Sequence, residues 1–353
     1  MDPNIATLHD VARLAGVSVS TASRILKAKD GDPIPFAEQT QSRVRKAATQ
    51  LGYRPSKLAR SLVGSRTGIV GLIVPSLQDG FFPSITSALQ SRLNSSGYNV
   101  LLVNTEQDFE IERAAIDDFL AWRADGLIVA PTQNTFDARL FWELWRINVP
   151  FVLLDRYFED TPFCSVTTDD RAGAVMAVEH LLNLGRTRIA RACTTRPIST
   201  GKLRRHGYDE ALLRHGFTPN PAYVLHAETN VRAGWGVVDQ LMALNPRPDA
   251  LFCFSDVVAV GVIEACLERG LRVPDDLAVV GYADLDMSRF VKTRLTTIRQ
   301  PQEEIGRMAG QMLLDRLAGR TIDNPQAVLP VELVVRESTV GDGVRAENPS
   351  HTL

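Results

Sequence analysis

Small and polar side chains near the N-terminus are of the types that contact nucleic acid. Val19 and Ser20 would lie in the first turn of a short helix, and Arg24 would lie one turn later. An arginine can donate two hydrogen bonds to guanine in the major groove, so these three residues are predicted to contact bases. Hydroxyl groups bind phosphates, which position a protein on DNA without reading its sequence. The predicted phosphate contacts are Thr7, Ser18, Thr21 and Ser23.

Two short helices joined by a glycine are predicted to position these side chains. Thr7 can cap the first helix, and Gly16 permits the left-handed conformation that ends it. Ser18 can cap the second helix. The apolar residues recur at helical spacing and form the inward stripes: Leu8, Val11, Ala12 and Ala15, then Ala22, Ile25 and Leu26. This pattern is typical of a helix-turn-helix, whose second helix enters the major groove. A helical hairpin with a solvated polar face is the alternative.

A third helix is predicted over residues 37–51, between Pro35 and Gly52. Residues 1–66 contain 11 Lys and Arg against 5 Asp and Glu, a net charge of +6. The whole chain has a net charge of −2, so the remainder carries −8. A basic head on an acidic body is expected of a protein that contacts DNA at one end only.

A basic segment follows at residues 53–66, where Pro55 interrupts the helical pattern. Residues 56–63 could form a two-turn helix, which would be marginal alone in water and would fold when docked. Two such helices, one from each subunit, could enter the minor groove and insert Leu62 as an apolar wedge. The predicted minor-groove residues are Lys57, Ala59 and Leu62. An ordinary basic linker is the alternative.

Length and composition indicate a multidomain intracellular protein. The chain has 353 residues, of which 44% are hydrophobic, and it contains no apolar run near the length of a membrane span. The start, Met-Asp-Pro-Asn, lacks the pattern of a signal peptide. The four cysteines have no metal-ligand spacing and are expected to be buried, reduced thiols: Cys164, Cys193, Cys253 and Cys266. We therefore expect a cytoplasmic protein.

Short apolar runs alternate with helical patterns from residue 67 onward. The predicted strands are 69–74, 100–103, 126–130 and 151–154, then 189–193, 224–226, 251–254 and 278–282. The predicted helices are 82–96, 111–122 and 136–145, then 171–184, 202–215, 232–244 and 257–268. Such alternation is typical of doubly wound parallel sheets. Two runs predict two lobes, with a ligand beyond the carboxyl ends of their strands.

The chain resembles the lactose/galactose/purine repressor (LacI/GalR) family of bacterial transcription regulators. The resemblance extends from about residue 7 to residue 340. It is carried by residues 7–26, by Tyr53-Arg-Pro with Leu58-Ala-Arg-Ser-Leu62, by Leu295-Thr-Thr-Ile-Arg-Gln300 and by Leu329-Pro-Val-Glu-Leu-Val-Val-Arg-Glu337. It implies a periplasmic-binding-protein-like α/β core and a homodimer that binds a pseudo-palindromic operator. It also implies control by a small-molecule effector, most commonly a sugar, and repression as the usual outcome.

The implied domain organisation has four parts: a helix-turn-helix domain (1–52), a hinge (53–66), an effector-binding and dimerisation core (67–340) and a disordered tail (341–353). Lobe 1 of the core is expected at about 67–166 and 296–329, and lobe 2 at about 167–295 and 330–340. The tail carries no leucine heptad, so we expect a dimer rather than a tetramer.

Eight residues are predicted to bind the effector: Phe81, Phe82, Asp169, Arg204, Thr229, Ser255, Asp284 and Gln300. An aromatic ring can stack on a sugar face, although one of the two phenylalanines is expected to be plain core. Asp169 could accept ligand hydroxyls or cap the next helix. Arg204 matches the arginine with which the family anchors its effector, whereas Arg205 is expected at the surface. Asp256 could cap the helix that follows it.

Three features depart from the family pattern. Position 283, usually an effector-binding aspartate, is Ala283, and Thr229 stands where relatives often have an aromatic residue. The pocket is therefore expected to suit a larger or less polar ligand, or to bind weakly. The loop at residues 27–35 is about four residues longer than usual, and Asp30 and Asp32 make it acidic.

Two other classes of protein are considered. An enzyme is disfavoured because no dinucleotide-binding, P-loop or nucleophile-elbow motif is present. The histidines show no metal-ligand spacing, so neither a metal nor a cofactor is expected. A solute-binding sensor without an operator remains the alternative function, which the DNA-binding head disfavours.

Overall fold

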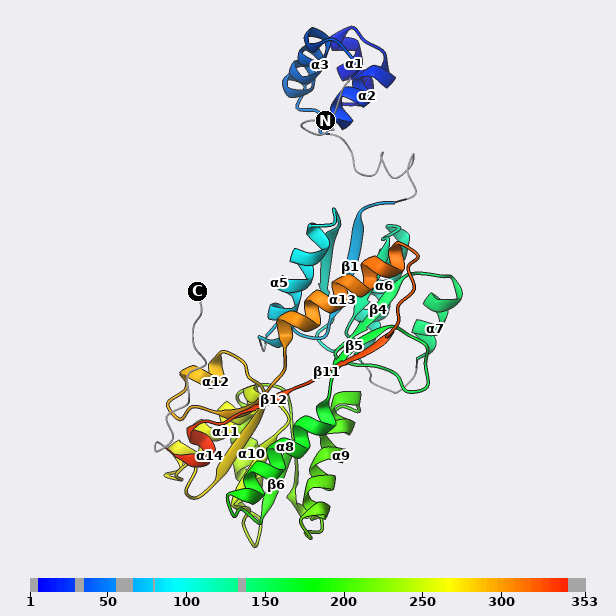
Figure 1. Cartoon of the computed structure of the whole chain (residues 1–353). Helices are drawn as coiled ribbons and strands as arrows, with labels where there is room; N and C mark the ends of the chain where they lie inside the picture. Colours follow the sequence, from blue (N-terminus) through cyan, green and yellow to red (C-terminus); the bar gives the residue numbers. More distant parts are fainter. Residues whose placement is uncertain (1–5, 29–34, 55–65, 79, 133–137, 342–353) are drawn as a thin grey trace. The chain divides into compact units, whose positions relative to one another are not determined.

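The computed structural model describes residues 6–28, 35–54, 66–78, 80–132 and 138–341, and it divides the chain into two compact units, residues 1–67 and 68–353 (Figure 1). The predicted hinge residues Lys57, Ala59 and Leu62, the middle of the long loop at 29–34 and the tail from 342 onward lie outside the described residues. No described helix is long and apolar enough to span a membrane.

The first unit contains three helices, α1 (Leu8–Ala15), α2 (Val19–Lys27) and α3 (Glu38–Gln50). Thr7 and Asp10 form a reciprocal capping box at the start of α1, and Gly16 ends that helix with a φ of 63°. The inward stripes are confirmed, because Val11, Ala22 and Ile25 are at most 1% exposed and pack with α3 in one small core. The sequence folds locally as a helix-turn-helix because each helix buries its apolar stripe and keeps its polar face in solvent.

The second unit is built on two six-stranded sheets. The first sheet has the order β11-β5-β4-β3-β1-β2, with β1 (Ile69–Val74), β2 (Asn99–Asn104), β3 (Gly126–Val129), β4 (Phe151–Leu154), β5 (Ser165–Thr168) and β11 (Gln326–Leu329). The second has the order β12-β10-β9-β8-β6-β7, with β6 (Ile189–Thr194), β7 (Val224–Ala227), β8 (Ala250–Cys253), β9 (Ala278–Ala283), β10 (Thr296–Arg299) and β12 (Glu332–Val334). All pairs are parallel except β10 with β12.

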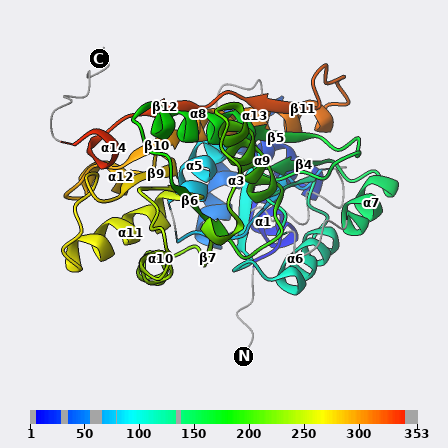
Figure 2. The same cartoon turned by 90° about the horizontal axis from the view of Figure 1, so that it is seen from below.

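Helices cover both faces of each sheet, so each lobe is doubly wound as predicted (Figures 1 and 2). In lobe 1, α5 (Phe81–Asn94) and α13 (Gln302–Leu317) bury one face, while α6 (Phe109–Ala121) and α7 (Arg139–Arg146) bury the other. In lobe 2, α8 (Asp170–Asn183) and α9 (Ser199–Arg214) lie on one face, and α10 (Ala233–Met242) and α11 (Asp256–Glu268) on the other. The short elements are η1 (Pro221–Tyr223), α12 (Met287–Phe290) and α14 (Glu337–Val340).

The chain crosses between the sheets three times, and two crossings differ from the prediction. Residues 296–299 pair with β9 in the second sheet, and residues 167–168 belong to β5 in the first. The lobe boundaries were predicted at about 166 and 295, and the pairing of β5 and β10 continues two and four residues beyond those positions. The third crossing lies between β11 and β12, near residue 330.

Helix α13 was absent from the predicted elements, and it fixes the outer face of lobe 1. It packs along α5, and a Cβ at Gly306 would lie 2.3 Å from the carbonyl oxygen of Ile85. Only glycine permits the two backbones to approach so closely at that point. The helix follows the second crossing directly, so its position is tied to the segment that connects the lobes.

Candidate DNA-binding face and interlobe site

The outer face of α2 presents the predicted base-contacting residues. Val19 is 37% exposed, and Ser20 and Arg24 are exposed. Within the described residues, Arg24 has no ion pair with a protein carboxylate. Its exposure on α2 is compatible with the predicted base contact, which stays a prediction.

The hydroxyls predicted to bind phosphates also have structural roles. The amide of Thr21 donates to Ser18 Oγ over 3.1 Å, and the Thr21 hydroxyl lies 2.8 Å from that oxygen. The Thr7 hydroxyl donates to Asp10 Oδ2 over 2.6 Å. These bonds hold the first turns of α1 and α2 in place, so removing either cap would change the helix as well as any phosphate contact. Ser23 is half-exposed on the second turn of α2.

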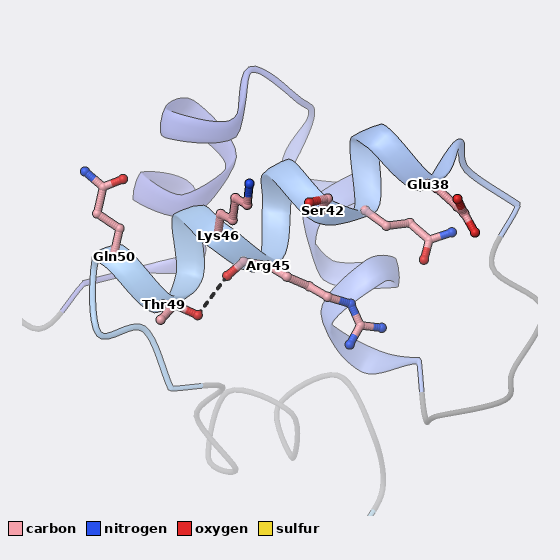
Figure 3. A pocket seen from close by; sticks show the side chains of 7 residues that line it. Glu38, Ser42, Arg45, Lys46, Thr49 and Gln50 are labelled. Atoms are coloured by element: carbon pink, nitrogen blue, oxygen red, sulfur yellow. Dashed lines mark hydrogen bonds between the residues drawn. The ribbon is translucent and has the colours of Figure 1, made fainter.

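A polar hollow of about 700 Å³ lies along α3 (Figure 3), and Glu38, Gln41, Ser42, Arg45, Lys46, Thr49 and Gln50 line it. The Thr49 hydroxyl donates to the carbonyl oxygen of Arg45 over 3.0 Å, and the Gln41 amide nitrogen donates to the carbonyl of Phe36 over 2.8 Å. Its two cations, Arg45 and Lys46, contribute to the positive charge of the head, which attracts DNA whatever its sequence.

In the second unit, Arg204 belongs to a buried ion pair at the carboxyl ends of the lobe 2 strands. Its Nε donates to Asp170 Oδ1 over 2.7 Å, and its Nη1 donates to the carbonyl of Phe254. Its guanidinium carbon lies 3.6 Å from the ring centroid of Tyr282. Burial raises the pKa of Asp170, and the charge of Arg204 opposes that rise. The ion pair and the ring contact fix the guanidinium at the lobe 2 side of the interlobe region.

Lobe 1 contributes Asp155 and Arg156, which sequence reasoning missed. Asp155 follows β4 with a φ of 62°, is 8% exposed, and lies close enough to Arg204 for their charges to interact. Arg156 Nη1 donates to the carbonyl of Pro131 over 2.8 Å, which holds the end of β3 beside the end of β4. The sequence could have indicated this site, because the charged residue Asp155 directly follows the apolar strand 151–154.

Several hydrogen bonds connect the lobes near these residues. The amide of Tyr157 donates to Ser199 Oγ over 3.3 Å, and Arg196 Nη1 donates to the carbonyl of Gln107 over 3.1 Å. Lys202 Nζ lies 2.7 Å from a carboxylate oxygen of Glu159. The lobes therefore meet partly through polar contacts, which a bound ligand could replace or reinforce. A buried apolar cluster also joins lobe 1 to Val257, Ala283 and Leu285 of lobe 2.

A cavity of about 800 Å³ lies along α6 and α7 of lobe 1, and lobe 2 contributes Arg196 to its lining. Arg113, Arg139 and Arg196 line it together with Glu106, Asp108, Glu110 and Glu143. Mixed charges of this kind suit a polar ligand rather than a purely apolar one.

The crossing segments are also held by hydrogen bonds. Gln300 Nε2 donates to Thr168 Oγ1 over 2.8 Å, which joins the first and second crossings. Gln302 Nε2 donates to the carbonyl of Ala283 over 3.0 Å, and therefore connects α13 of lobe 1 to the end of β9 in lobe 2. Gln300, predicted to bind the effector, therefore lies on the second crossing between the lobes and is 4% exposed.

The remaining predicted effector residues divide between the core, helix caps and one loop. Phe81 and Phe82 are 8% and 3% exposed, and both belong to a buried apolar cluster that includes Val257, Ala283 and Leu285 of lobe 2, so their contact with an effector stays a prediction. Asp169 caps α8 by accepting from the amide of Ala172 over 2.9 Å, which is the alternative role considered for it. Ser255 caps α11, and Thr229 is half-exposed in the loop after β7.

Asp256, which could have been a helix cap, is instead a buried carboxylate that accepts hydrogen bonds from three other residues. It is 0% exposed, and it accepts hydrogen bonds from the Ser288 hydroxyl over 2.7 Å and the Leu285 amide over 2.8 Å. The Thr297 hydroxyl donates to its other oxygen over 2.5 Å. Its carboxylate therefore ties α11 to β10 and to the segment after β9.

Asp284, predicted to bind the effector, is surrounded by three arginines that donate to its carboxylate oxygens. Its Oδ1 accepts from Arg336 over 2.6 Å, and its Oδ2 accepts from Arg299 over 2.8 Å and from Arg289 over 3.0 Å. The carboxylate is 1% exposed. Burial opposes its ionisation, but the hydrogen bonds from Arg299 and Arg336 hold its pKa below the usual range.

The stabilising effect of Asp284 is expected to depend on pH. A carboxyl with a lowered folded-state pKa stabilises the protein above its unfolded-state pKa, and the effect is lost as pH falls through the folded-state value. The difference in free energy of unfolding between the wild type and Asp284→Asn should be full at about pH 6 and should shrink below about pH 4. Denaturant titrations across this range measure it. The exposed Asp275→Asn is the control, and a difference that stays constant down to about pH 3 would contradict the role of Asp284.

Comparisons with known proteins agree with this architecture. Residues 7–56 match the family model "Bacterial regulatory proteins, lacI family", and residues 178–339 match "Periplasmic binding protein-like domain". The transcriptional repressor CytR of Escherichia coli (strain K12) is 32% identical over 334 residues, which cover 95% of this chain and 96% of that protein. The ribose operon repressor of Halalkalibacterium halodurans is 32% identical over 345 residues, covering 98% of this chain and 100% of that repressor.

Solved structures show the same similarity. A lac repressor dimer bound to operator and the anti-inducer ONPF matches with a TM-score of 0.84 and 29% identity, covering 95% of this chain and 99% of that one. A complex of the transcriptional regulator CelR with cellobiose matches with a TM-score of 0.70 and 29% identity, covering 94% of this chain and 99% of that one. This chain, with its helix-turn-helix head and two-lobed core, belongs to the LacI family of bacterial regulatory proteins.

Proposed function

We propose that this protein is a cytoplasmic transcription repressor that binds a pseudo-palindromic operator as a homodimer. The exposed face of α2 carries this proposal, because it presents Val19, Ser20 and Arg24 on a helix whose other side is fully packed. Two-fold symmetry of the protein then requires two half-sites in the DNA. The hinge residues Lys57, Ala59 and Leu62 are proposed to enter the minor groove between those half-sites.

We further propose that a polar small molecule, a sugar or sugar derivative, binds between the lobes and changes operator affinity. The proposal is supported by the approach of Asp155 from lobe 1 to Arg204 from lobe 2. A carboxylate accepts hydrogen bonds from hydroxyls, and a guanidinium donates to ring or hydroxyl oxygens. Because Asp170 and Phe254 already occupy two donors of Arg204, the ligand would use those that remain.

The side chains at two positions that depart from the family pattern should set the size of the ligand. Thr229 and Ala283 are both smaller than the residues usual in the family, and Ala283 has no side-chain acceptor. The ligand is therefore expected to be larger than a simple monosaccharide, or to rely on Asp155 for its hydroxyl contacts.

Thermal unfolding of the full chain with a panel of mono-, di- and acidic sugars, sugar phosphates and purines tests the ligand class. A compound at about 100 times its dissociation constant should stabilise the protein by about 2.7 kcal/mol. The same compound should then change operator affinity in a titration. A compound that stabilises the protein but leaves operator affinity unchanged would show that ligand binding does not regulate DNA binding. If no compound of the panel stabilised the protein, the proposed ligand class would be contradicted.

A further inference from the structure

A thiol and an imidazole lie side by side at one edge of the lobe 2 sheet. Cys193 on β6 pairs in register with His226 on β7, and Cys193 Sγ lies 3.5 Å from His226 Nδ1. Strand β7 is the outermost strand on this side of the sheet. His226 is exposed and Cys193 is half-buried, so a small solute can reach the sulfur.

The other three cysteines have no such access. Cys164, Cys253 and Cys266 are 3%, 0% and 0% exposed. Burial raises the pKa of all the thiols for which a shift is resolved, including that of Cys193. Cys193 is therefore protonated at neutral pH, and it needs a nearby base to become a nucleophile. The thiol donates to the carbonyl oxygen of Leu225 over 3.3 Å, and when it turns from that oxygen His226 Nδ1 can accept its proton, provided that the ring carries its own proton on Nε2.

Two guanidinium groups favour negative charge on this sulfur. Arg191 lies two residues before Cys193 on β6, so both side chains lie on the same face of the sheet. Arg191 is 9% exposed, and within the described residues its Nε has no hydrogen-bond partner and its guanidinium forms no ion pair. Arg205 on α9 acts on Cys193 in the same direction. A buried guanidinium without a carboxylate beside it is an unusual arrangement, and an anion formed on Cys193 would compensate its charge.

We propose that Cys193 is an oxidative modification site that reacts with hydroperoxides, with His226 as its proton acceptor. The thiol proton moves to His226 Nδ1, and the thiolate attacks the distal oxygen of the hydroperoxide. An S–O bond forms as the O–O bond breaks, and the departing alkoxide or hydroxide takes the proton from the imidazolium. The products are a sulfenic acid and an alcohol or water, so sulfur loses the two electrons that the peroxide gains.

The first test compares the four cysteines of the full-length chain. The protein is treated with hydrogen peroxide in the presence of dimedone, which traps sulfenic acids, and each cysteine peptide is followed by mass spectrometry. Cys193 should be labelled at least about 10-fold faster than each of the three buried cysteines. Labelling of Cys193 no faster than that of the buried cysteines would overturn the proposal.

The second test separates the proton acceptor from simple exposure. In His226→Asn an amide that is not a base replaces the imidazole, so labelling of Cys193 should slow by about 10-fold or more. His206→Asn removes an exposed histidine of α9 and should leave the rate unchanged. A local loosening of the strand pair would make labelling faster rather than slower. An unchanged rate in His226→Asn would therefore disprove the role of the imidazole.

Discussion

Replacing Arg204 with alanine is expected to lower the free energy of unfolding by about 3–5 kcal/mol, because Asp170 would be left as an unpaired buried charge. The carboxylate of Asp170 is 1% exposed, and it forms an ion pair with Arg204 at 2.7 Å. The loss of the cation above the Tyr282 ring adds to the cost. Urea titrations of the variant and the wild type measure the difference.

Two variants make this prediction specific. Arg214→Ala on the same helix removes an exposed ion pair with Glu210, and should change the free energy of unfolding by at most about 1 kcal/mol. The double variant Arg204→Met with Asp170→Leu removes both buried charges, and should recover much of the stability lost in Arg204→Ala. That folded double variant should also lose the stabilisation by the effector. A loss below about 1 kcal/mol in Arg204→Ala would show that Asp170 does not need this buried ion pair.

Replacing Arg24 with alanine is expected to weaken operator binding by about 1–3 kcal/mol and to relax the preference at one base position of each half-site. The side chain is exposed on α2 and is not part of the core of the head, so the fold should be unaffected. Titration of the operator and of its single-base variants, at fixed salt, gives both the affinity and the base preference.

Ser23→Ala is the matched control for Arg24→Ala. Ser23 is on the same helix and is predicted to contact phosphate, so its removal should weaken binding to all sequences by a similar factor. If Arg24→Ala also weakened every sequence equally, Arg24 would be a phosphate contact and the assignment of base reading to it would be incorrect.

The head could be predicted in detail from the sequence because its signals are local. Thr7, Gly16 and Ser18 determine the caps, and the apolar stripes of α1 and α2 have helical spacing. The central strands of the core were predicted nearly to the residue for the same reason, since β1 and β4 are continuous apolar runs.

The crossing strands could not be predicted in this way. Strand β5 reads Ser-Val-Thr-Thr and β10 reads Thr-Thr-Ile-Arg, and neither is an apolar run. Each is a strand because it pairs with a neighbour in a buried sheet, and that neighbour is distant in sequence or lies across a loop. Polar side chains are tolerated there because they hydrogen-bond between the crossings, as Thr168 does with Gln300.

The pairing of charged residues in the core could not be predicted from local patterns, because it joins positions that are distant in sequence. The three arginines around Asp284 come from positions 289, 299 and 336, and no local pattern brings them together. Asp169 and Asp170 are adjacent in sequence, yet Asp169 caps α8 while Asp170 pairs with Arg204. Which of two neighbouring carboxylates faces the interlobe region is decided by the packing of α8 on α9.

The most direct test of the proposed function is a binding-site selection from random double-stranded DNA with the full-length protein. We expect enrichment of a pseudo-palindrome of two half-sites, in which Arg24→Ala relaxes one position of each half. Enrichment of no motif, or of a single half-site without two-fold symmetry, would contradict a dimeric operator-specific repressor.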